Sequence, residues 1–479
     1  MRFRSLLWGG LLSLSAVLAA PTANQEPPTL AKRAVPTSTF SNNVIFSPPS
    51  NAGWTDPRVL YARSIQLSDG SLLATWENYS PEPPLVYFPI YRSTDGGVKW
   101  TQIGKVQDTV NNWGLRYQPD LYELPRAIGK YPKGTILCTG NSIPTDLSKT
   151  KIDVYASTDG GKTWKFASSI ASGGEARPNN GLTPVWEPHM MVYQDKLVCY
   201  YADQRDPKHG QKLSHQTTTD LVSWSALVND VADSNYNARP GMPGITLLPN
   251  GQYIFVYETC GTQGCRIFYR LTSDPLNILA AKEYALVSDK GTRPVSSPTV
   301  VWSSVGGANG SIIVSAGSQS QIFVNKNLGA ENSWVEFATP QPNAYTRGLM
   351  VFKENDNFLA IIGGGWLPPS STNQVSLSVI DLKKTGLDAI AQSVLAAHKL
   401  EKFFSCFYQT VMISRVVDPY KCIAVPNERS LDSPVSLGPA TTEINSLKGG
   451  VAASIDLNLV EKHAYDDRYI LVVGDQMIV

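Results

Sequence analysis

Two glutamates stand in sequence positions where an acidic side chain is unexpected. Glu187 lies within "PVWEPHMMVY", and Glu258 follows an apolar run in "YIFVYETCG". Apolar and aromatic surroundings make a carboxylate costly to ionise and raise its pKa. Two such groups in one cavity can divide the work, one as a protonated acid and one as an ionised nucleophile or base. The alternative is structural, with each glutamate in an ion pair with an arginine such as Arg177, Arg205 or Arg239.

A sequence repeat indicates the scaffold. "YRSTDGGVKW" ends at Trp100 and "YASTDGGKTW" ends at Trp164. Asp-Gly favours a tight turn between two strands, and the Ser and Asp side chains can bond the backbone of that turn. Weaker echoes follow, and the corresponding residues of all six copies are Asp95, Asp159, Asp220, Asp274, Asn327 and Asp381. Their steps of 64, 61, 54, 53 and 54 residues predict an all-β, six-bladed β-propeller with about four strands in each blade.

A second pattern places the two glutamates in this ring. An apolar strand, a polar turn and another apolar strand recur, with turns predicted at Asp69-Gly70, Gln194-Asp195, Asn250-Gly251 and Glu354-Asn355. We interpret these as the inner and second strands of successive blades. Glu187 then heads an inner strand, and Glu258, 71 residues later, ends the second strand of the next blade at the same mouth. "NNVIFSPP" near residue 45 is interpreted as the strand that closes the ring, and no long amphipathic helix is expected between residues 40 and 385.

The stretches that enter the inner strands have the composition of a sugar site. They are rich in Arg, Tyr, Trp and Pro, which offer aromatic faces to a sugar ring and polar groups to its hydroxyls. The bland alternative is that these prolines end loops and the arginines bond backbone carbonyls. The candidate substrate-binding residues are Arg63, Tyr117, Trp186, His189, Arg239 and Arg347. The loops "NNWGLRY" and "GGGWLPPSS" are the expected walls of the site.

The two ends of the chain differ from its centre. Arg2 and Arg4 precede an apolar stretch that ends in small residues, which is typical of a secretory signal peptide over residues 1–20. Residues 21–33 are interpreted as a leader ending in a Lys-Arg processing site, and residues 34–386 as the propeller. Residues 387–479 carry no echo of the repeat and form a C-terminal extension, either a small appended domain or an artefact of the gene model. We therefore expect a secreted, extracellular protein.

Net charge, cysteine spacing and sequons give information on partners, disulfides and surface positions. A net charge of +1 gives no indication of a nucleic-acid partner. Cys260 and Cys265 enclose only "GTQG", so they are the best disulfide candidates among six cysteines, and their bridge would brace the loop after Glu258. No spacing of His and Cys resembles a zinc site. Sequons at Asn78 and Asn309 predict two surface positions if these asparagines are glycosylated.

Several phrases together resemble a known family. The two "STDGG" boxes, "PVWEPHMMVY", "ARPGMPGITLLPNGQYIFVYE", "YTRGLM" and "GGGWLPPS" are similar to the fungal exo-arabinanases of glycoside hydrolase family 93, over roughly residues 40–386. The resemblance implies a sialidase-like propeller that releases arabinobiose from the non-reducing end of α-1,5-L-arabinan with retention of configuration. It implies catalytic carboxylates at Glu187 and Glu258 and an active-site tyrosine at Tyr345. We assign Glu187 as nucleophile and Glu258 as general acid/base, while the reverse order stays open.

The same resemblance implies a polysaccharide or oligosaccharide substrate and no metal or organic cofactor. We expect a monomer with no nucleic-acid partner and no membrane association in the mature form. The segment after Gly386 does not resemble the family.

Two other functions remain open because the boxes alone also occur in sialidases and in receptors without enzymatic activity. A sialidase clamps its substrate with three arginines and attacks with a tyrosine, and Arg63, Arg239 and Arg347 are available for such a clamp. The first blade, however, carries "DPRVLYARS" and no "RIP"-type arginine phrase. The second alternative is a secreted propeller that binds a sugar without cleaving it.

Overall fold

A computed structural model describes residue 36, residues 38–50 and 53–385, and four short strands near the C-terminus. The chain divides into two units, Met1–Ser405 and Cys406–Val479. In the second unit β25 (Ala464–Tyr465) pairs with β26 (Arg468–Tyr469), and β27 (Leu471–Val473) pairs with β28 (Gln476–Ile478). The predicted signal peptide, leader and most of the C-terminal extension lie outside the described residues, and so do Cys406 and Cys422.

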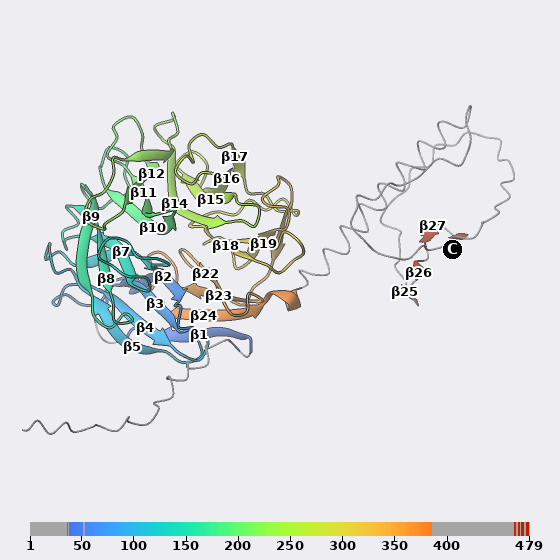
Figure 1. Cartoon of the computed structure of the whole chain (residues 1–479), viewed down its shortest axis with the longest axis horizontal. Helices are drawn as coiled ribbons and strands as arrows, with labels where there is room; N and C mark the ends of the chain where they lie inside the picture. The colour runs from blue at the N-terminus through green and yellow to red at the C-terminus, as the bar shows by residue number, and fades with distance from the viewer. Residues whose placement is uncertain are drawn as a thin grey trace, which may run out of the picture. The chain divides into compact units, whose positions relative to one another are not determined.

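The first unit contains six antiparallel sheets of four strands arranged around one axis (Figure 1). Blade 1 consists of β2 (Val59–Gln66), β3 (Leu72–Asn78), β4 (Phe88–Ser93) and β5 (Thr101–Val106). Blade 2 consists of β6 (Leu115–Glu123), β7 (Ile136–Ser142), β8 (Thr150–Ser157) and β9 (Lys165–Gly173). Blade 3 consists of β10 (Val185–Tyr193), β11 (Lys196–Asp203), β12 (Lys212–Thr218) and β13 (Val228–Val231).

The remaining blades follow the same order. Blade 4 consists of β14 (Arg239–Leu247), β15 (Tyr253–Cys260), β16 (Arg266–Thr272) and β17 (Glu283–Ala285). Blade 5 consists of β18 (Thr299–Ser303), β19 (Ser311–Ser315), β20 (Ile322–Asn325) and β21 (Trp334–Phe337). Blade 6 consists of β22 (Gly348–Val351), β23 (Phe358–Gly363), β24 (Val375–Asp381) and β1 (Phe40–Phe46). The prediction of six blades is confirmed.

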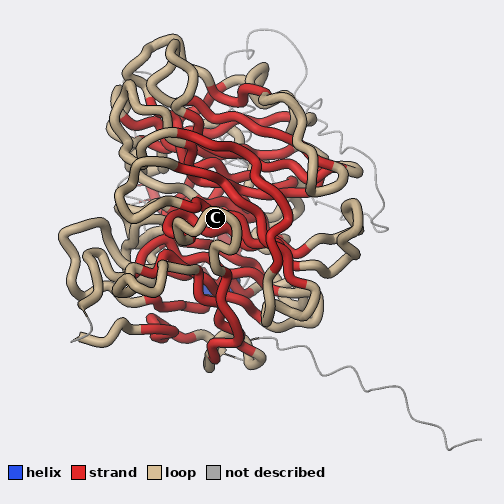
Figure 2. Tube along the Cα trace, turned by 90° about the vertical axis from the view of Figure 1, so that its left-hand side faces the viewer, coloured by secondary structure: helices blue, strands red, loops and turns tan. Residues whose placement is uncertain are grey.

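The ring is closed by its two ends. β1 pairs antiparallel with β24 as the outer strand of blade 6, so the first and last strands of the propeller share one sheet. This is the closing role predicted for the segment near residue 45. Strands and loops account for almost all of the described ring (Figure 2), whose one helix is η1, a 3-10 turn at Leu382–Thr385. Within the described residues no helix is long and apolar enough to cross a membrane.

Each gap between neighbouring blades holds a hydrophobic core. Six clusters of buried side chains fill the six gaps. In β3, Leu72 and Trp76 join the cluster shared with blade 6, whereas Leu73 joins the cluster shared with blade 2. Successive side chains of a strand point to opposite faces, and here both faces are covered. The second strands therefore read as continuous apolar runs without alternation.

Five of the six repeat positions lie on the turn after the third strand of a blade, and the sixth, Asp381, is the last residue of the third strand of blade 6. In blade 1 the Ser93 hydroxyl accepts a hydrogen bond from the Gly97 N–H at 2.9 Å, and Asp95 Oδ1 accepts from the N–H groups of Val98 and Lys99. Blade 2 repeats this arrangement at Ser157 and Asp159. The weaker echoes keep the local bonds, with Asn325 taking the place of the serine in blade 5. The sequence repeat is therefore a set of self-bonded turns.

The two sequons differ in exposure. Asn309 is exposed, as a surface position requires. Asn78 is buried at the end of β3, where its amide donates to the Ser80 hydroxyl at 3.2 Å. Asn78 is therefore not placed as a glycosylated asparagine would be, because the strand end turns this side chain into the protein.

Candidate active site

The inner strands share one irregularity at the mouth of the ring. At or just before each inner strand lies a residue other than glycine with a φ between 49° and 58°. In blades 1 to 4 this residue sits inside a register shift of the strand pair. Such bulges re-aim side chains, and positive φ at residues other than glycine is a strain that concentrates at functional sites. The six residues are Tyr61, Gln118, Glu187, Met242, Ser297 and Thr346.

The positive-φ residues also link blades 1 to 5 in succession. In four places the backbone N–H of such a residue donates to a polar side chain of the preceding blade. The four bonds are Gln118 to Glu77 (2.9 Å), Glu187 to Gln118 (3.0 Å), Met242 to Glu187 (2.6 Å) and Ser297 to Glu258 (2.6 Å). A chain of backbone donors therefore fixes the acidic side chains that face the axis, which a sequence pattern alone does not reveal.

Glu187 is positioned between blades 3 and 4. It lies in the bulge of β10 with φ 58°, and its carboxylate accepts the Met242 N–H. The same oxygen lies against Gly241, where a Cβ atom would come within 3.0 Å of it. Gly241 in turn pairs directly with Glu258 across β14 and β15. The carboxylate of Glu187 and the backbone of Glu258 thus both neighbour one glycine, and Glu187 and Glu258 come from adjacent blades as predicted.

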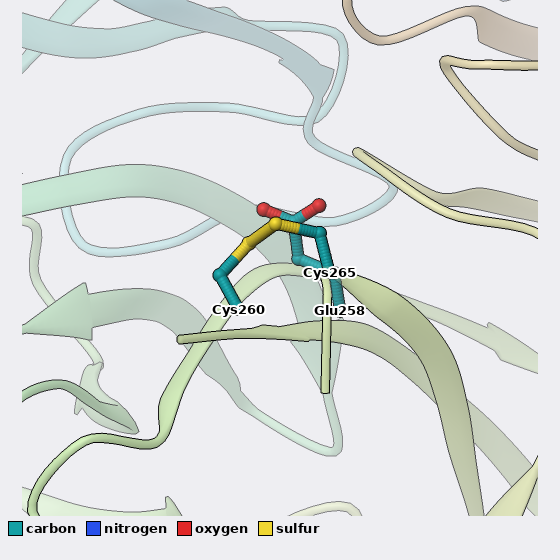
Figure 3. Close-up of side chains that lie close together, drawn as sticks. All are labelled: Glu258, Cys260 and Cys265. Atoms are coloured by element: carbon teal, nitrogen blue, oxygen red, sulfur yellow. A yellow bond between two sulfur atoms is a disulfide. The ribbon is translucent and has the colours of Figure 1, made fainter. Parts of the chain in front are cut away.

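Glu258 ends the second strand of blade 4 beside a disulfide. Cys260 and Cys265 are bonded, as predicted. A carboxylate oxygen of Glu258 and the two sulfurs lie within 4.8 Å of one another (Figure 3). Because both sulfurs are in the disulfide, they are not thiolate ligands, and this cluster does not fit a metal ion. The bridge instead places an apolar cover beside the carboxyl.

The pKa values of the two carboxyls are both raised. Burial raises the pKa of Glu187 to about 7, opposed by the Met242 N–H and by the charges of Arg239 and Arg63. Burial raises the pKa of Glu258 to about 8, and the charge of Glu187 raises it further. The two groups titrate as a coupled pair. Glu258 holds its proton more firmly, because the negative charge of Glu187 raises its pKa. The ionised form of Glu187 is instead favoured by the charges of Arg239 and Arg63.

The carboxyls open into one cavity of about 640 Å³ at the mouth of the ring. Its volume suits a ligand of oligosaccharide size. The cavity is lined by Asp56, Pro57, Leu60, Glu77, Tyr79, Tyr117, Gln118, Ala176, Pro178, Trp186, Glu187, Gln211, Arg239, Glu258, Cys260, Gly261, Cys265, Ser296, Tyr345, Leu367 and Pro368. The two loops predicted as walls contribute Tyr117 and the pair Leu367 and Pro368.

Several predicted binding residues face this cavity. Tyr117 and Trp186 lie in its wall with ring centroids 6.4 Å apart. Arg239 lies beside both catalytic candidates, and its guanidinium donates to Gln204, Gln211 and the Pro178 carbonyl. Tyr345 lines the cavity, and burial together with the charges of Glu187 and Glu258 raises its pKa well above the usual value. A tyrosine in that field stays a neutral phenol.

Three predicted binding residues do not line the cavity. The prediction for Arg347 is wrong, because this side chain is fully buried and donates to carbonyls of Gln319, Gln321 and Gln341 and to Thr339 Oγ1. Arg63 lies deeper along β2, over the Tyr61 ring and bonded to Thr346 Oγ1. His189 lies two residues beyond Glu187, with Nδ1 3.6 Å from Asp120 Oδ2. Arg347 therefore has the structural role of an arginine that bonds backbone carbonyls.

One acidic residue of the cavity escaped the sequence prediction. Glu77 is buried at the end of β3, and burial raises its pKa to about 7. It occupies the same place in blade 1 that Glu258 occupies in blade 4, the end of the second strand. The phrase "SLLATWE" ends in a glutamate as "YIFVYE" does, so the two could have been matched by aligning the blades.

The fold and the site together define a class of enzyme. A six-bladed propeller with a pair of buried carboxyls facing one cavity is the machinery of a glycoside hydrolase. No protein-family model matches the chain, and a search of curated proteins finds no match. Solved structures do match, and they identify the family.

Two of the similar structures are enzymes solved with arabinobiose. The GH93 α-L-arabinofuranosidase of Fusarium graminearum, solved with arabinobiose, is 56% identical, with a TM-score of 0.71, over 72% of this chain and 99% of that chain. The α-L-arabinanase of Penicillium chrysogenum, also complexed with arabinobiose, is 53% identical, with a TM-score of 0.71, over 73% and 99%. A protein of unknown function from Dyadobacter fermentans, 14% identical with a TM-score of 0.51, shares the fold alone. The chain belongs to glycoside hydrolase family 93.

Proposed function

We propose that the protein is an exo-arabinanase that releases arabinobiose from the non-reducing end of α-1,5-linked L-arabinan, with retention of configuration. The observation that carries this proposal is the pair Glu187 and Glu258, held by neighbouring blades around Gly241 and facing one cavity. The two enzymes solved with arabinobiose, at 56% and 53% identity, support the choice of sugar.

The mechanism assigns one role to each carboxyl. Glu258, the more firmly protonated group, gives its proton to the glycosidic oxygen as the leaving sugar departs. Glu187 attacks the anomeric carbon as the carboxylate and forms a covalent arabinosyl-enzyme. Glu258, now ionised, takes a proton from water, which attacks the anomeric carbon and releases the sugar from Glu187. Arg239 and Arg63 favour the ionised form of Glu187, which supports this order of roles.

The arginines and Tyr345 count against a sialidase. Of the three arginines considered for a carboxylate clamp, only Arg239 lines the cavity. The Arg347 guanidinium donates its hydrogen bonds to backbone carbonyls. The raised pKa of Tyr345 makes its phenolate costly, so a tyrosine nucleophile is disfavoured. Tyr345 is instead proposed to bond the sugar or to orient Glu187 as a neutral hydroxyl.

We also propose that the protein acts outside the cell. Its sequence begins with a pattern typical of a signal peptide. The disulfide beside Glu258 supports this location, because such bonds persist in oxidising compartments. Secretion of the full chain by an expressing host, with cleavage after the leader determined by N-terminal sequencing, tests the proposal. Retention of the chain inside the cells would refute it.

Product analysis on linear arabinan tests substrate, direction and product together. We expect chromatography to detect arabinobiose as the first product, and proton NMR to detect the retained anomer before mutarotation. Glu187→Gln and Glu258→Gln should each lower kcat at least a thousandfold, since each removes a reacting group. Glu123→Gln is a matched control. Glu123 lies at the opposite end of the inner strand β6 from Gln118, does not line the cavity, and bonds the Ser68 hydroxyl. Activity on a sialoside alone, or binding of arabinan without cleavage, would refute the proposal.

A further inference from the structure

The cavity has a carboxyl on the side opposite the general acid. Glu77 belongs to blade 1 and Glu258 to blade 4, which are three blades apart in a ring of six. Both line the same cavity at the ends of second strands. Because the acid must stand beside the leaving oxygen, Glu77 lies across the cavity from the bond that breaks. The proposed mechanism gives it no chemical step.

The contacts of Glu77 leave part of its bonding capacity unused. Oε1 accepts the Gln118 N–H at 2.9 Å, and Oε2 accepts the Tyr79 hydroxyl at 2.6 Å. A carboxylate offers about four acceptor positions, so each oxygen has room for another donor. The cation that acts on its charge, Arg63, donates its own hydrogen bond to Thr346. The group is thus fixed by two donors and still offers acceptor positions to the cavity that it lines.

Aromatic rings run along the wall beside Glu77. The Tyr79 and Tyr117 centroids are 6.1 Å apart, and those of Tyr117 and Trp186 are 6.4 Å apart. All three rings line the cavity, and they lead from Glu77 toward Glu187. Such faces pack against the C–H side of a sugar ring, while a carboxyl oxygen beside them accepts hydrogen bonds from its hydroxyls.

We propose that Glu77 binds the hydroxyls of the sugar at the non-reducing end of the substrate, and that this contact fixes the length of the saccharide released. The inference rests on the proposed function, since it assumes that Glu258 marks the leaving-group side. Glu77 and the aromatic wall define the end of the cavity where the chain stops, and Glu187 and Glu258 define the bond that is cut. The distance between them selects the product.

Kinetics on linear arabino-oligosaccharides test this role. Glu77→Gln keeps the shape but replaces one acceptor by a donor, so KM for arabinotriose should rise about 10- to 100-fold, with a change in kcat of less than about fivefold. Free arabinose should appear beside arabinobiose among the first products, because the chain is no longer held at one register. Tyr79→Phe, which removes one of the donors that fix Glu77, should raise KM about threefold to tenfold. Glu123→Gln, on the same substrate, should match the wild type.

The outcomes separate this inference from the proposed function. A wild-type protein that fails to cleave arabinan refutes the proposed function, and calorimetry with arabinobiose then tests Glu77 alone, where Glu77→Gln should weaken binding at least tenfold. Cleavage by the wild type with unchanged KM and products in folded Glu77→Gln would overturn the role of Glu77. A loss confined to kcat would overturn it as well, because it would place Glu77 in the chemical step. If Glu77→Gln does not fold, an unchanged KM in Tyr79→Phe overturns the role.

Discussion

Replacing Gly241 by alanine should displace the nucleophile without unfolding the protein. A Cβ at this position would lie 3.0 Å from Glu187 Oε2 and 3.0 Å from Gln211 Nε2, whereas ordinary contacts begin at 3.4 Å. The carboxylate must therefore move by about 0.4 Å, away from the Met242 N–H that holds the same oxygen. Catalytic groups tolerate misplacement of only about 0.5 Å, and about 1 Å costs about a hundredfold. We expect kcat/KM on arabinotriose to fall about 10- to 100-fold.

The same strand offers a matched control for this prediction. At Gly244, three residues further along β14, an added Cβ would meet Val256 at 3.3 Å and Val300 at 3.6 Å, and no carboxylate. Gly244→Ala should keep kcat/KM within about threefold of the wild type, and both variants should unfold within a few degrees of it. Full activity in a folded Gly241→Ala protein would refute the reasoning, because it would show that the position of Glu187 does not limit the reaction.

Three further predictions concern the electrostatics of the site. Arg239→Gln should shift both limbs of the pH profile of kcat/KM to higher pH, because the arginine charge lowers the pKa of both Glu187 and Glu258. Arg239→Lys, which keeps the charge, should shift the profile little. An unchanged profile in Arg239→Gln would contradict this reasoning. A carboxyl whose pKa rises from 4.5 to about 8 on folding stabilises the protein below pH 4.5, and this stabilisation is lost as the pH rises through 8. The free energy of unfolding of Glu258→Gln should therefore fall between pH 5 and pH 8 by about 3 kcal/mol less than that of the wild type. Parallel curves for the two proteins would refute this. Replacing Cys260 and Cys265 together by serine should admit water beside Glu258 and lower the alkaline pKa of kcat/KM, with an unchanged alkaline limb as the contrary result.

The repeat carried most of the information about the fold. The hydrogen bonds of the Asp-Gly turns join residues close in sequence, so a few residues around Asp95 and Asp159 are enough to predict each turn. Their spacing then counts the blades, and the weak echo at Asn327 lies where the count requires it. The placement of Glu187 and Glu258 on adjacent blades followed from the same count. A repeat architecture turns sequence distance into position around a ring.

The errors came from side-chain direction. Arg347 follows the positive-φ residue Thr346, and His189 directly follows a register shift, so alternation does not say which way either side chain points. The sequence did not identify Glu77 as a site residue, because many apolar strands end in a single acidic residue. Its burial, its place in the cavity wall and the bond from the Gln118 N–H distinguish it in the structure.

The sequence by itself determined the number of blades, the strand order within them, the disulfide and the blades that carry the two central glutamates, because these depend on local turns and on periodic apolar patterns. The tertiary structure decided which polar groups share the cavity. Glu77 joined them and Arg347 did not, since the positive-φ residues at the mouth interrupt the two-residue period of the inner strands. At that point the direction of a side chain depends on hydrogen bonds from the neighbouring blade, which no spacing within a single strand encodes.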